Sequence, residues 1–226
     1  ALVIARGAQI DAQGTATEPI IFTSVADEIA PGQVASPNLE PTQEGLYQHY
    51  KAVAAAAPKP VILYNVPGRT GCDLLPETVA QLCGHPSIIG LKEAVGDEGR
   101  WAALYPLAGP DFSLLSGDDP TFVRAMLGGA DGVISVASNV LPRAFARLCA
   151  LASAGEADAA RALDARLQPV YDFTGIESNP IPVKALLARQ GIGHGLRLPL
   201  LPLSAPHAAL ADQMAALCRQ VEQELA

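Results

Sequence analysis

A lysine and a tyrosine end two neighbouring apolar runs of this chain. Lys92 follows Ile-Ile-Gly-Leu at 88–91, and Tyr64 follows Val-Ile-Leu at 61–63. An apolar surrounding disfavours the charged form of a lysine amine, and the neutral amine can attack a carbonyl carbon to form a Schiff base. A phenol both donates and accepts a proton, so Tyr64 could act as a proton relay. The pair indicates carbonyl chemistry; the alternatives are a lysine at a solvent-exposed strand end and a packed tyrosine.

An arginine lies close after the tyrosine in a segment that favours a rigid turn. Arg69 belongs to Asn-Val-Pro-Gly-Arg-Thr-Gly at 65–71. A guanidinium group binds a carboxylate through two parallel hydrogen bonds, which suits a keto acid substrate. The alternative is a solvated loop arginine. Together with Lys92 and Tyr64, Arg69 favours a site for an acid that carries a carbonyl group.

The surrounding pattern alternates short apolar strands with amphipathic helices. This alternation predicts an α/β fold with a parallel sheet, in which catalytic groups lie at the carboxyl ends of the strands. We expect strands at 60–65, 87–92, 112–116 and 132–137. We expect helices at 44–56, 76–83 and 97–107, one that ends at 128–129, and four more at 143–154, 156–171, 182–190 and 206–225. Four βα units are half of an eight-unit barrel.

Three regions of different character divide the chain. Residues 1–38 form an atypical β-rich segment, residues 39–140 a partial barrel that holds the candidate Schiff-base lysine, and residues 141–226 a set of C-terminal helices. The start at Ala1 rather than Met suggests a trimmed or incomplete product.

Composition argues against several classes of protein. The net charge of -8, without a basic run, argues against nucleic acid as a partner. The apolar stretches are too short to span a membrane, and the start lacks a signal-peptide pattern. The four cysteines lack disulfide or C-x-x-C spacing, which favours the cytoplasm, and the four scattered histidines indicate no metal site.

Four segments resemble, in order and spacing, the consecutive signatures of the dihydrodipicolinate synthase family. They are Val-Ile-Leu-Tyr-Asn-Val-Pro-Gly-Arg-Thr-Gly at 61–71, Ile-Gly-Leu-Lys-Glu-Ala at 89–94, Leu-Ser-Gly-Asp-Asp at 115–119 and Gly-Val-Ile-Ser-Val at 132–136. Asn-Pro-Ile-Pro-Val-Lys at 179–184 resembles the family's helical segment after the barrel. The resemblance implies the last four βα units of a (β/α)8 TIM barrel, followed by a C-terminal helical appendix.

The resemblance also implies a site. Lys92 would form an imine with pyruvate, so no separate cofactor is expected, and Tyr64 would donate and accept protons. Arg69 would bind the carboxylate of the incoming aldehyde, while Gly117 and Ile134 would line the pyruvate pocket through backbone atoms. The implied reaction condenses pyruvate with aspartate semialdehyde to 4-hydroxy-tetrahydrodipicolinate, in lysine and diaminopimelate biosynthesis. The family resemblance further suggests a homo-oligomer.

The first part of the chain departs from the family pattern. Counting back without gaps from Pro41, the place of the family's relay tyrosine holds Asn38. Thr15 lies too few residues before Tyr64 to match the family's threonine loop. Residues 1–42 instead resemble a segment of secreted parallel β-helix proteins, which suggests a junction near 39–43.

These departures leave three readings of the function. The first is a pyruvate-dependent Schiff-base lyase with an incomplete proton relay. The second is an inactive truncated fusion that acts only by association, because a half-barrel exposes sheet edges and an apolar interior. The third is another pyruvate aldolase, such as N-acetylneuraminate lyase.

Overall fold

A computed structural model describes residues 41–193 and 195–226 of the chain. The chain divides into two compact units, Ala1–Thr42 and Gln43–Ala226. The predicted β-rich segment 1–38, with Thr15 and Asn38, lies outside the described residues. The division predicted at residue 140 stays a prediction.

A parallel four-stranded sheet forms the centre of the second unit. Its strands follow chain order, and each pairs in parallel with the next. They are β1 (Val61–Asn65), β2 (Ile88–Glu93), β3 (Ser113–Ser116) and β4 (Gly132–Val133). The predicted α/β class with a parallel sheet is confirmed.

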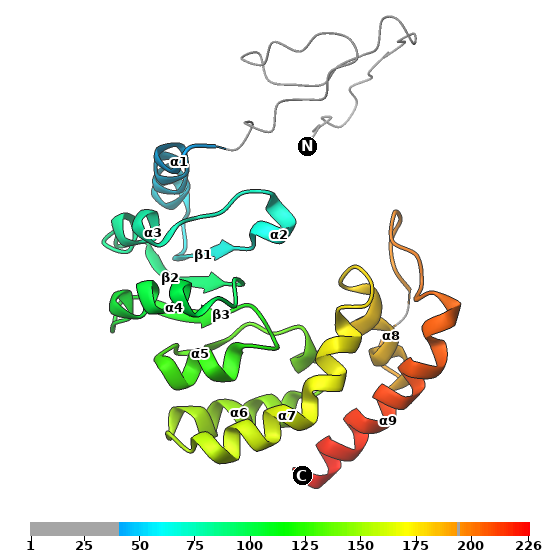
Figure 1. The fold of residues 1–226 in the computed structure, drawn as a ribbon. Helices are drawn as coiled ribbons and strands as arrows, with labels where there is room; N and C mark the ends of the chain where they lie inside the picture. The colour runs from blue at the N-terminus through cyan, green and yellow to red at the C-terminus, as the bar shows by residue number, and fades with distance from the viewer. Residues whose placement is uncertain (1–40, 194) are drawn as a thin grey trace, which may run out of the picture. The chain divides into compact units, whose positions relative to one another are not determined.

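Helices alternate with the strands and stack beside one another in Figure 1. They are α1 (Gln43–Ala56), α3 (Pro76–Leu82), α4 (Glu98–Leu104) and α5 (Phe122–Gly128). Pro76 occupies the first turn of α3, where its missing N–H costs no hydrogen bond. The Asp97 side chain caps α4 by accepting the Arg100 N–H at 2.9 Å. Local sequence therefore sets where these helices begin.

The two faces of the sheet differ in burial. Leu63, Leu91 and Leu114 point into the core, and each is at most 1% exposed. On the other face Ile62 is 42% exposed and Tyr64 is 43% exposed. Side chains alternate between the faces of a strand, so one face packs against helices while the other carries exposed apolar side chains in the described part of the chain.

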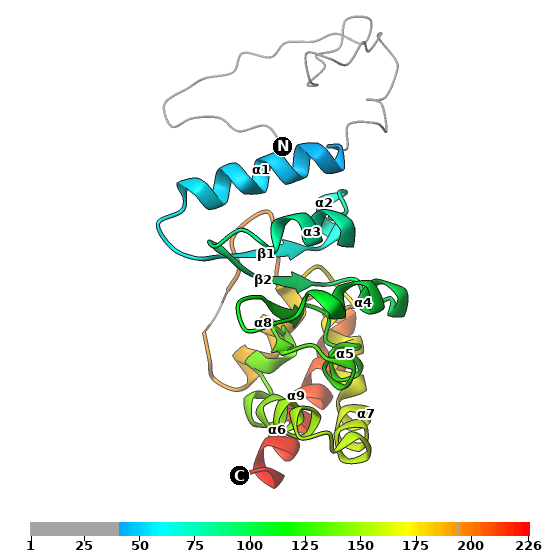
Figure 2. The same ribbon diagram turned by 90° about the vertical axis from the view of Figure 1, so that its left-hand side faces the viewer.

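The C-terminal helices continue the same core. They are α6 (Pro142–Ser153), α7 (Ala157–Thr174), α8 (Ile181–Arg189) and α9 (Ala208–Glu224), seen from a second side in Figure 2. Phe122 of α5 stacks on Phe145 of α6, with 4.9 Å between ring centroids. Phe145 in turn meets Tyr171 of α7 edge to face. These rings join α5 to the predicted C-terminal helices, and the buried residues of the sheet and of these helices belong to one hydrophobic core.

The fourth strand is shorter than its apolar run predicts. It ends at Val133, and Val136 has a helical backbone that leads into the 3₁₀ turn η2 (Ala137–Asn139). The buried Asp119 carboxylate accepts the N–H groups of Val136 at 3.2 Å and Ala137 at 2.8 Å. The prediction of a strand to residue 137 is therefore wrong, because the side chain of Asp119, which lies just before α5, accepts the backbone N–H groups that a longer strand would use.

Two other elements depart from the predicted pattern. The Pro-Gly segment after β1 forms the short helix α2 (Pro67–Thr70), which ends at Gly71 with a left-handed φ of 66°. The helix predicted at 97–107 is α-helical only to Leu104, and its last three residues form the 3₁₀ turn η1 (Tyr105–Leu107). Pro106 lies in that turn and has no N–H with which to continue the α-helical pattern.

Within the described residues, no helix has the length and apolar character needed to cross a membrane. The same residues contain no group of three or more His, Cys, Asp or Glu side chains that could hold a metal ion.

Candidate active site

Tyr64 and Lys92 meet at the carboxyl ends of β1 and β2. The two residues are partners in the parallel register. The Lys92 amine lies over the Tyr64 ring, 4.1 Å from its centroid, a distance at which an aromatic face attracts an ammonium group. Tyr64 is 43% exposed and Lys92 is half-buried, so solvent and small molecules can reach both. The structure brings together the amine and the phenol that the sequence singled out.

Gly117 lets the lysine side chain cross the end of β3. A Cβ atom at this position would lie 2.7 Å from Lys92 Cε and 3.1 Å from its Cγ. The Gly117 N–H also donates to the Glu93 carbonyl at 2.7 Å, which holds this backbone beside β2. Only a residue without a side chain allows so close an approach.

An open hollow of about 590 Å³ surrounds the two side chains. Arg69, on α2, and Asn179, just before α8, lie on its wall. The lining residues are Tyr64, Val66, Pro67, Gly68, Arg69, Lys92, Ala94, Val95, Gly117, Asp118, Val136 and Asn179. Four of the five predicted site residues therefore line one hollow.

Ile134 is the fifth predicted site residue, and it is not part of this lining. It follows β4, is 42% exposed, and donates its N–H to the Ser116 carbonyl at 2.8 Å. This hydrogen bond places Ile134 beside the end of β3, at the same carboxyl end of the sheet as Gly117.

Behind the hollow, Asn65 and Glu93 form a buried polar contact that the sequence analysis missed. They directly follow Tyr64 and Lys92 and point to the opposite face of the sheet. Asn65 Nδ2 donates to Glu93 Oε2 at 3.0 Å, and Glu93 Oε1 accepts the Val95 N–H at 2.7 Å. Burial raises the pKa of the Glu93 carboxyl, against the opposing effect of the hydrogen bonds from Asn65 and Val95. The sequence did offer a signal: a polar residue, Asn65 or Glu93, directly follows each of the two candidate catalytic residues.

Asp119 was also missed. It is 7% exposed and bonds to the backbone after β4. Burial raises the pKa of its carboxyl, while hydrogen bonds from Ser135 and from the Ala137 and Val136 amides lower it. Asp119 thereby fixes the chain just beyond Ile134. The Asp-Asp pair at 118–119 was noted only as part of a family signature, so no separate role was predicted for its second member.

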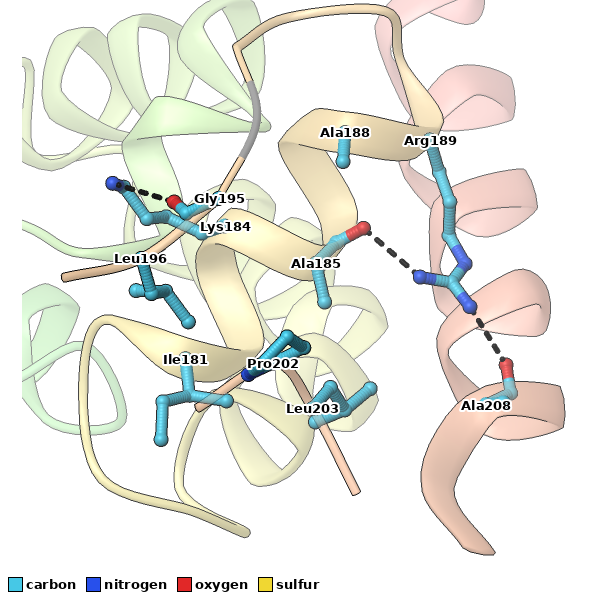
Figure 3. A pocket seen from close by; sticks show the side chains of 10 residues that line it. All are labelled: Ile181, Lys184, Ala185, Ala188, Arg189, Gly195, Leu196, Pro202, Leu203 and Ala208. Carbon is cyan, nitrogen blue, oxygen red and sulfur yellow. Dashed lines mark hydrogen bonds between the residues drawn. The ribbon is translucent and has the colours of Figure 1, made fainter. Parts of the chain in front are cut away.

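A second hollow, of about 240 Å³, lies between α8, the following loop and α9 (Figure 3). Lys184 in this hollow donates to the Gly195 carbonyl at 3.2 Å. Arg189 donates to the carbonyls of Ala185 and Ala208 and forms an ion pair with Asp212. The described residues that line it otherwise carry aliphatic side chains or none: Ile181, Ala185, Ala188, Gly195, Leu196, Pro202, Leu203 and Ala208. No phenol or carboxyl group stands beside this lysine in the lining, so acid–base chemistry favours the hollow at the strand ends.

Comparison with known proteins places most of the chain in one family. The dihydrodipicolinate synthetase family model matches residues 37–217. The chain is 62% identical to 4-hydroxy-tetrahydrodipicolinate synthase of Stenotrophomonas maltophilia (strain K279a) over 182 residues, 80% of this chain and 61% of that protein. It is 63% identical to the synthase of Xanthomonas axonopodis pv. citri (strain 306) over 183 residues, 81% of this chain and 61% of that protein.

A solved structure matches the fold. The chloride-inhibited dihydrodipicolinate synthase from Acinetobacter baumannii, complexed with pyruvate, superposes with a TM-score of 0.76 at 44% identity. The match covers 80% of this chain and 62% of that chain. The chain thus spans about 61% of the length of the curated relatives it matches.

The family model matches residues 37–217, and none of the reported matches supports the predicted likeness of residues 1–42 to parallel β-helix proteins. Residues 1–40 lie outside the described part of the structure. From residue 37 onward the sequence signatures, the parallel sheet and the relatives agree. The chain belongs to the dihydrodipicolinate synthetase family.

Proposed function

We propose that the protein is a pyruvate-dependent Schiff-base lyase that condenses pyruvate with aspartate semialdehyde to 4-hydroxy-tetrahydrodipicolinate. The observation that carries this proposal is the Lys92 amine, 4.1 Å above the Tyr64 ring in a hollow that Arg69 borders. Two relatives about 60% identical bear the name of this synthase, and the related Acinetobacter structure holds pyruvate.

In the proposed reaction the neutral Lys92 amine attacks the keto carbon of pyruvate. The carbonyl oxygen leaves as water with one amine proton and one further proton, so that the nitrogen keeps its second proton and a protonated imine remains. The cationic nitrogen draws electrons from the neighbouring methyl group, which loses a proton and becomes the nucleophilic carbon of an enamine. That carbon then forms a bond to the aldehyde carbon of the second substrate, whose oxygen takes up a proton and becomes the 4-hydroxyl group. The amine of the semialdehyde then displaces the Lys92 amine from the re-formed imine, which closes the ring and frees the lysine.

Tyr64 and Arg69 would serve the two substrates differently. The Tyr64 hydroxyl, on the ring over which the amine lies, would carry protons to and from the carbonyl oxygen. Arg69 is exposed on α2 at the rim of the hollow, where its guanidinium group can pair with the carboxylate of the semialdehyde. Gly117 and Ile134, whose N–H groups are bonded to the backbone of neighbouring strands, would line the pyruvate pocket through other backbone atoms.

We assign the sheet to the last four units of a (β/α)8 barrel. The relatives extend beyond the matched region, and the exposed Ile62 lies on the face that a closed barrel would bury. A cytoplasmic homo-oligomer fits this proposal. The same exposed face favours one alternative, an inactive chain that acts by association with another chain.

Trapping of the imine tests the proposal. The chain is incubated with pyruvate and borohydride, and the modified peptide is identified by mass. We expect a reduced adduct on Lys92 and none on Lys184, whose amine lies in the other hollow. A folded chain that forms no adduct on Lys92 would remove the lyase proposal and leave association.

The acceptor is tested separately. Condensation of pyruvate is measured, without borohydride, with aspartate semialdehyde and with N-acetylmannosamine as the acceptor. Faster consumption of aspartate semialdehyde, lost on Arg69→Met, is the expected result. Preference for the amino sugar would make the chain another pyruvate aldolase.

A further inference from the structure

We infer that Asn65 and Glu93 are positioning residues: their buried contact fixes the ends of β1 and β2 and thereby holds the Lys92 amine over the Tyr64 ring. The catalytic consequence of this inference rests on the proposed function, whereas the placement itself is a property of the fold.

The register couples the two pairs. Tyr64 stands opposite Lys92, and Asn65 stands opposite Glu93 one residue later. Because neighbouring residues of a strand point to opposite faces, the first pair faces the hollow and the second pair faces the helices. A shift or rotation of either strand end therefore moves both pairs together.

Asn65 and Glu93, which we call the outer pair, are both hydrogen-bonded and buried from water. Asn65 is 2% exposed and Glu93 is 1% exposed. Asn65 Nδ2 reaches both Glu93 carboxylate oxygens, at 3.0 and 3.2 Å, and Asn65 Oδ1 accepts the Leu74 N–H at 2.9 Å. Glu93 also accepts the Val95 N–H. The pair thus ties together two strands and the loops that follow them, and a buried polar group that loses a partner is costly.

A second layer holds this pair in place. Asn65 Nδ2 also donates to Asp73 Oδ1 at 2.8 Å, and the Asp73 carboxylate forms an ion pair with Arg100 of α4. Arg100 Nη1 donates to the Leu74 carbonyl at 3.1 Å. The segment between α2, which carries Arg69, and α3 is therefore anchored to the same network as β2.

The Asn65–Glu93 contact matters for the proposed reaction because it sets the position of the Lys92 backbone. Lys92 has a long flexible side chain, and its place over Tyr64 depends on where its own Cα lies at the strand end. A misplacement of about 1 Å in an active site can lower a rate about 100-fold. The outer pair is therefore expected to affect chemistry without touching a substrate.

The test compares Glu93→Gln and Glu93→Leu with Asp164→Asn. Asp164 is a matched control because burial also raises the pKa of its carboxyl, and it accepts a hydrogen bond from Tyr171 within α7, away from Lys92. Glu93→Gln keeps the shape of the side chain but turns one acceptor into a donor, so it serves if Glu93→Leu does not fold. All are made in the full chain.

Two readouts follow Lys92. The first is the NMR shift of its ε-methylene protons, which we expect the Tyr64 ring current to displace in the unmodified chain. The second is the rate of borohydride trapping with pyruvate. We expect both Glu93 variants to lose the displacement and to trap about 100-fold more slowly, with Asp164→Asn unchanged in both.

The outcomes separate this inference from the proposed function. A displacement that persists in a folded Glu93→Gln chain, or that is lost equally in Asp164→Asn, would overturn the inference. If the unmodified chain forms no adduct while the displacement is lost only in the Glu93 variants, the inference stands and the lyase proposal fails.

Discussion

The hollow at the strand ends and the hollow between α8 and α9 both contain a lysine, but the two lysines have different neighbours. Lys92 extends from a strand across the backbone of Gly117 and lies over an aromatic ring. Lys184 extends from a helix and donates to a backbone carbonyl. The first has a phenol beside its amine, and the second lies among aliphatic walls. A cation in a hollow therefore indicates chemistry only when a proton carrier stands beside it.

The largest difference between the two hollows is expected on removal of the amine. Lys92→Met should abolish the pyruvate adduct and lower the condensation rate more than about 1,000-fold, because no other described group can replace the nucleophile in that hollow. Lys184→Met should leave both unchanged. Rates are measured by trapping and by product formation at equal fractions of folded protein. An adduct that survives in Lys92→Met would show that the assignment of the amine is wrong.

Removal of the phenol should have the next largest effect. Tyr64→Phe keeps the ring over which the Lys92 amine lies but removes the hydroxyl that exchanges protons. Loss of a general acid and base lowers a rate by about 100- to 10,000-fold. The rate of imine trapping is compared between the two chains across pH. An equal rate at every pH would mean that water or another group carries the proton.

A single added methyl group should disturb the first hollow by a smaller factor. Gly117→Ala places a Cβ atom 2.7 Å from Lys92 Cε, so the lysine must move, and we expect trapping to slow about 100-fold or less. Gly84→Ala is the matched control, since a Cβ there meets nothing within 4 Å. Wild-type trapping by Gly117→Ala would indicate that the lysine side chain reaches the hollow by another route.

The smallest expected effect is on stability as a function of pH. Burial raises the pKa of Glu93 in the folded chain above its unfolded value, so the protonated form is favoured by folding. Its contribution to stability is complete below the unfolded pKa of about 4.3 and is lost as the pH rises through the folded pKa. Urea unfolding should therefore show a steeper fall of stability with rising pH in the unmodified chain than in Glu93→Gln. Parallel curves would argue against a raised pKa.

Several features of the fold and the site could be predicted from local patterns. The four apolar runs mark the strands, and Pro76 and Asp97 mark the starts of two helices. Tyr64 and Lys92 could be paired in advance because parallel strands bring their carboxyl ends to one edge of the sheet. The position of Gly117 next to the lysine stem required the register of β2 against β3.

Other features depended on contacts that no local pattern carries. The early end of β4 follows from Asp119, which takes the N–H groups of Val136 and Ala137 across 17 and 18 residues of sequence. The contact between Asn65 and Glu93 joins residues that are 28 apart. Whether a polar residue at a strand end faces water or the core depends on which face the helices cover, and only packing decides that.

The sequence by itself determined the chemistry at hand: an amine, a phenol and a guanidinium group placed at or just after strand ends, with a glycine at the end of the next strand. Only the tertiary structure decided their geometry. It set the amine over the ring, placed four predicted residues around one hollow, and buried the Asn65 and Glu93 pair behind them. The physical reason is that covalent order fixes which groups a strand carries, whereas the register between strands and the packing of helices fix the distances between them.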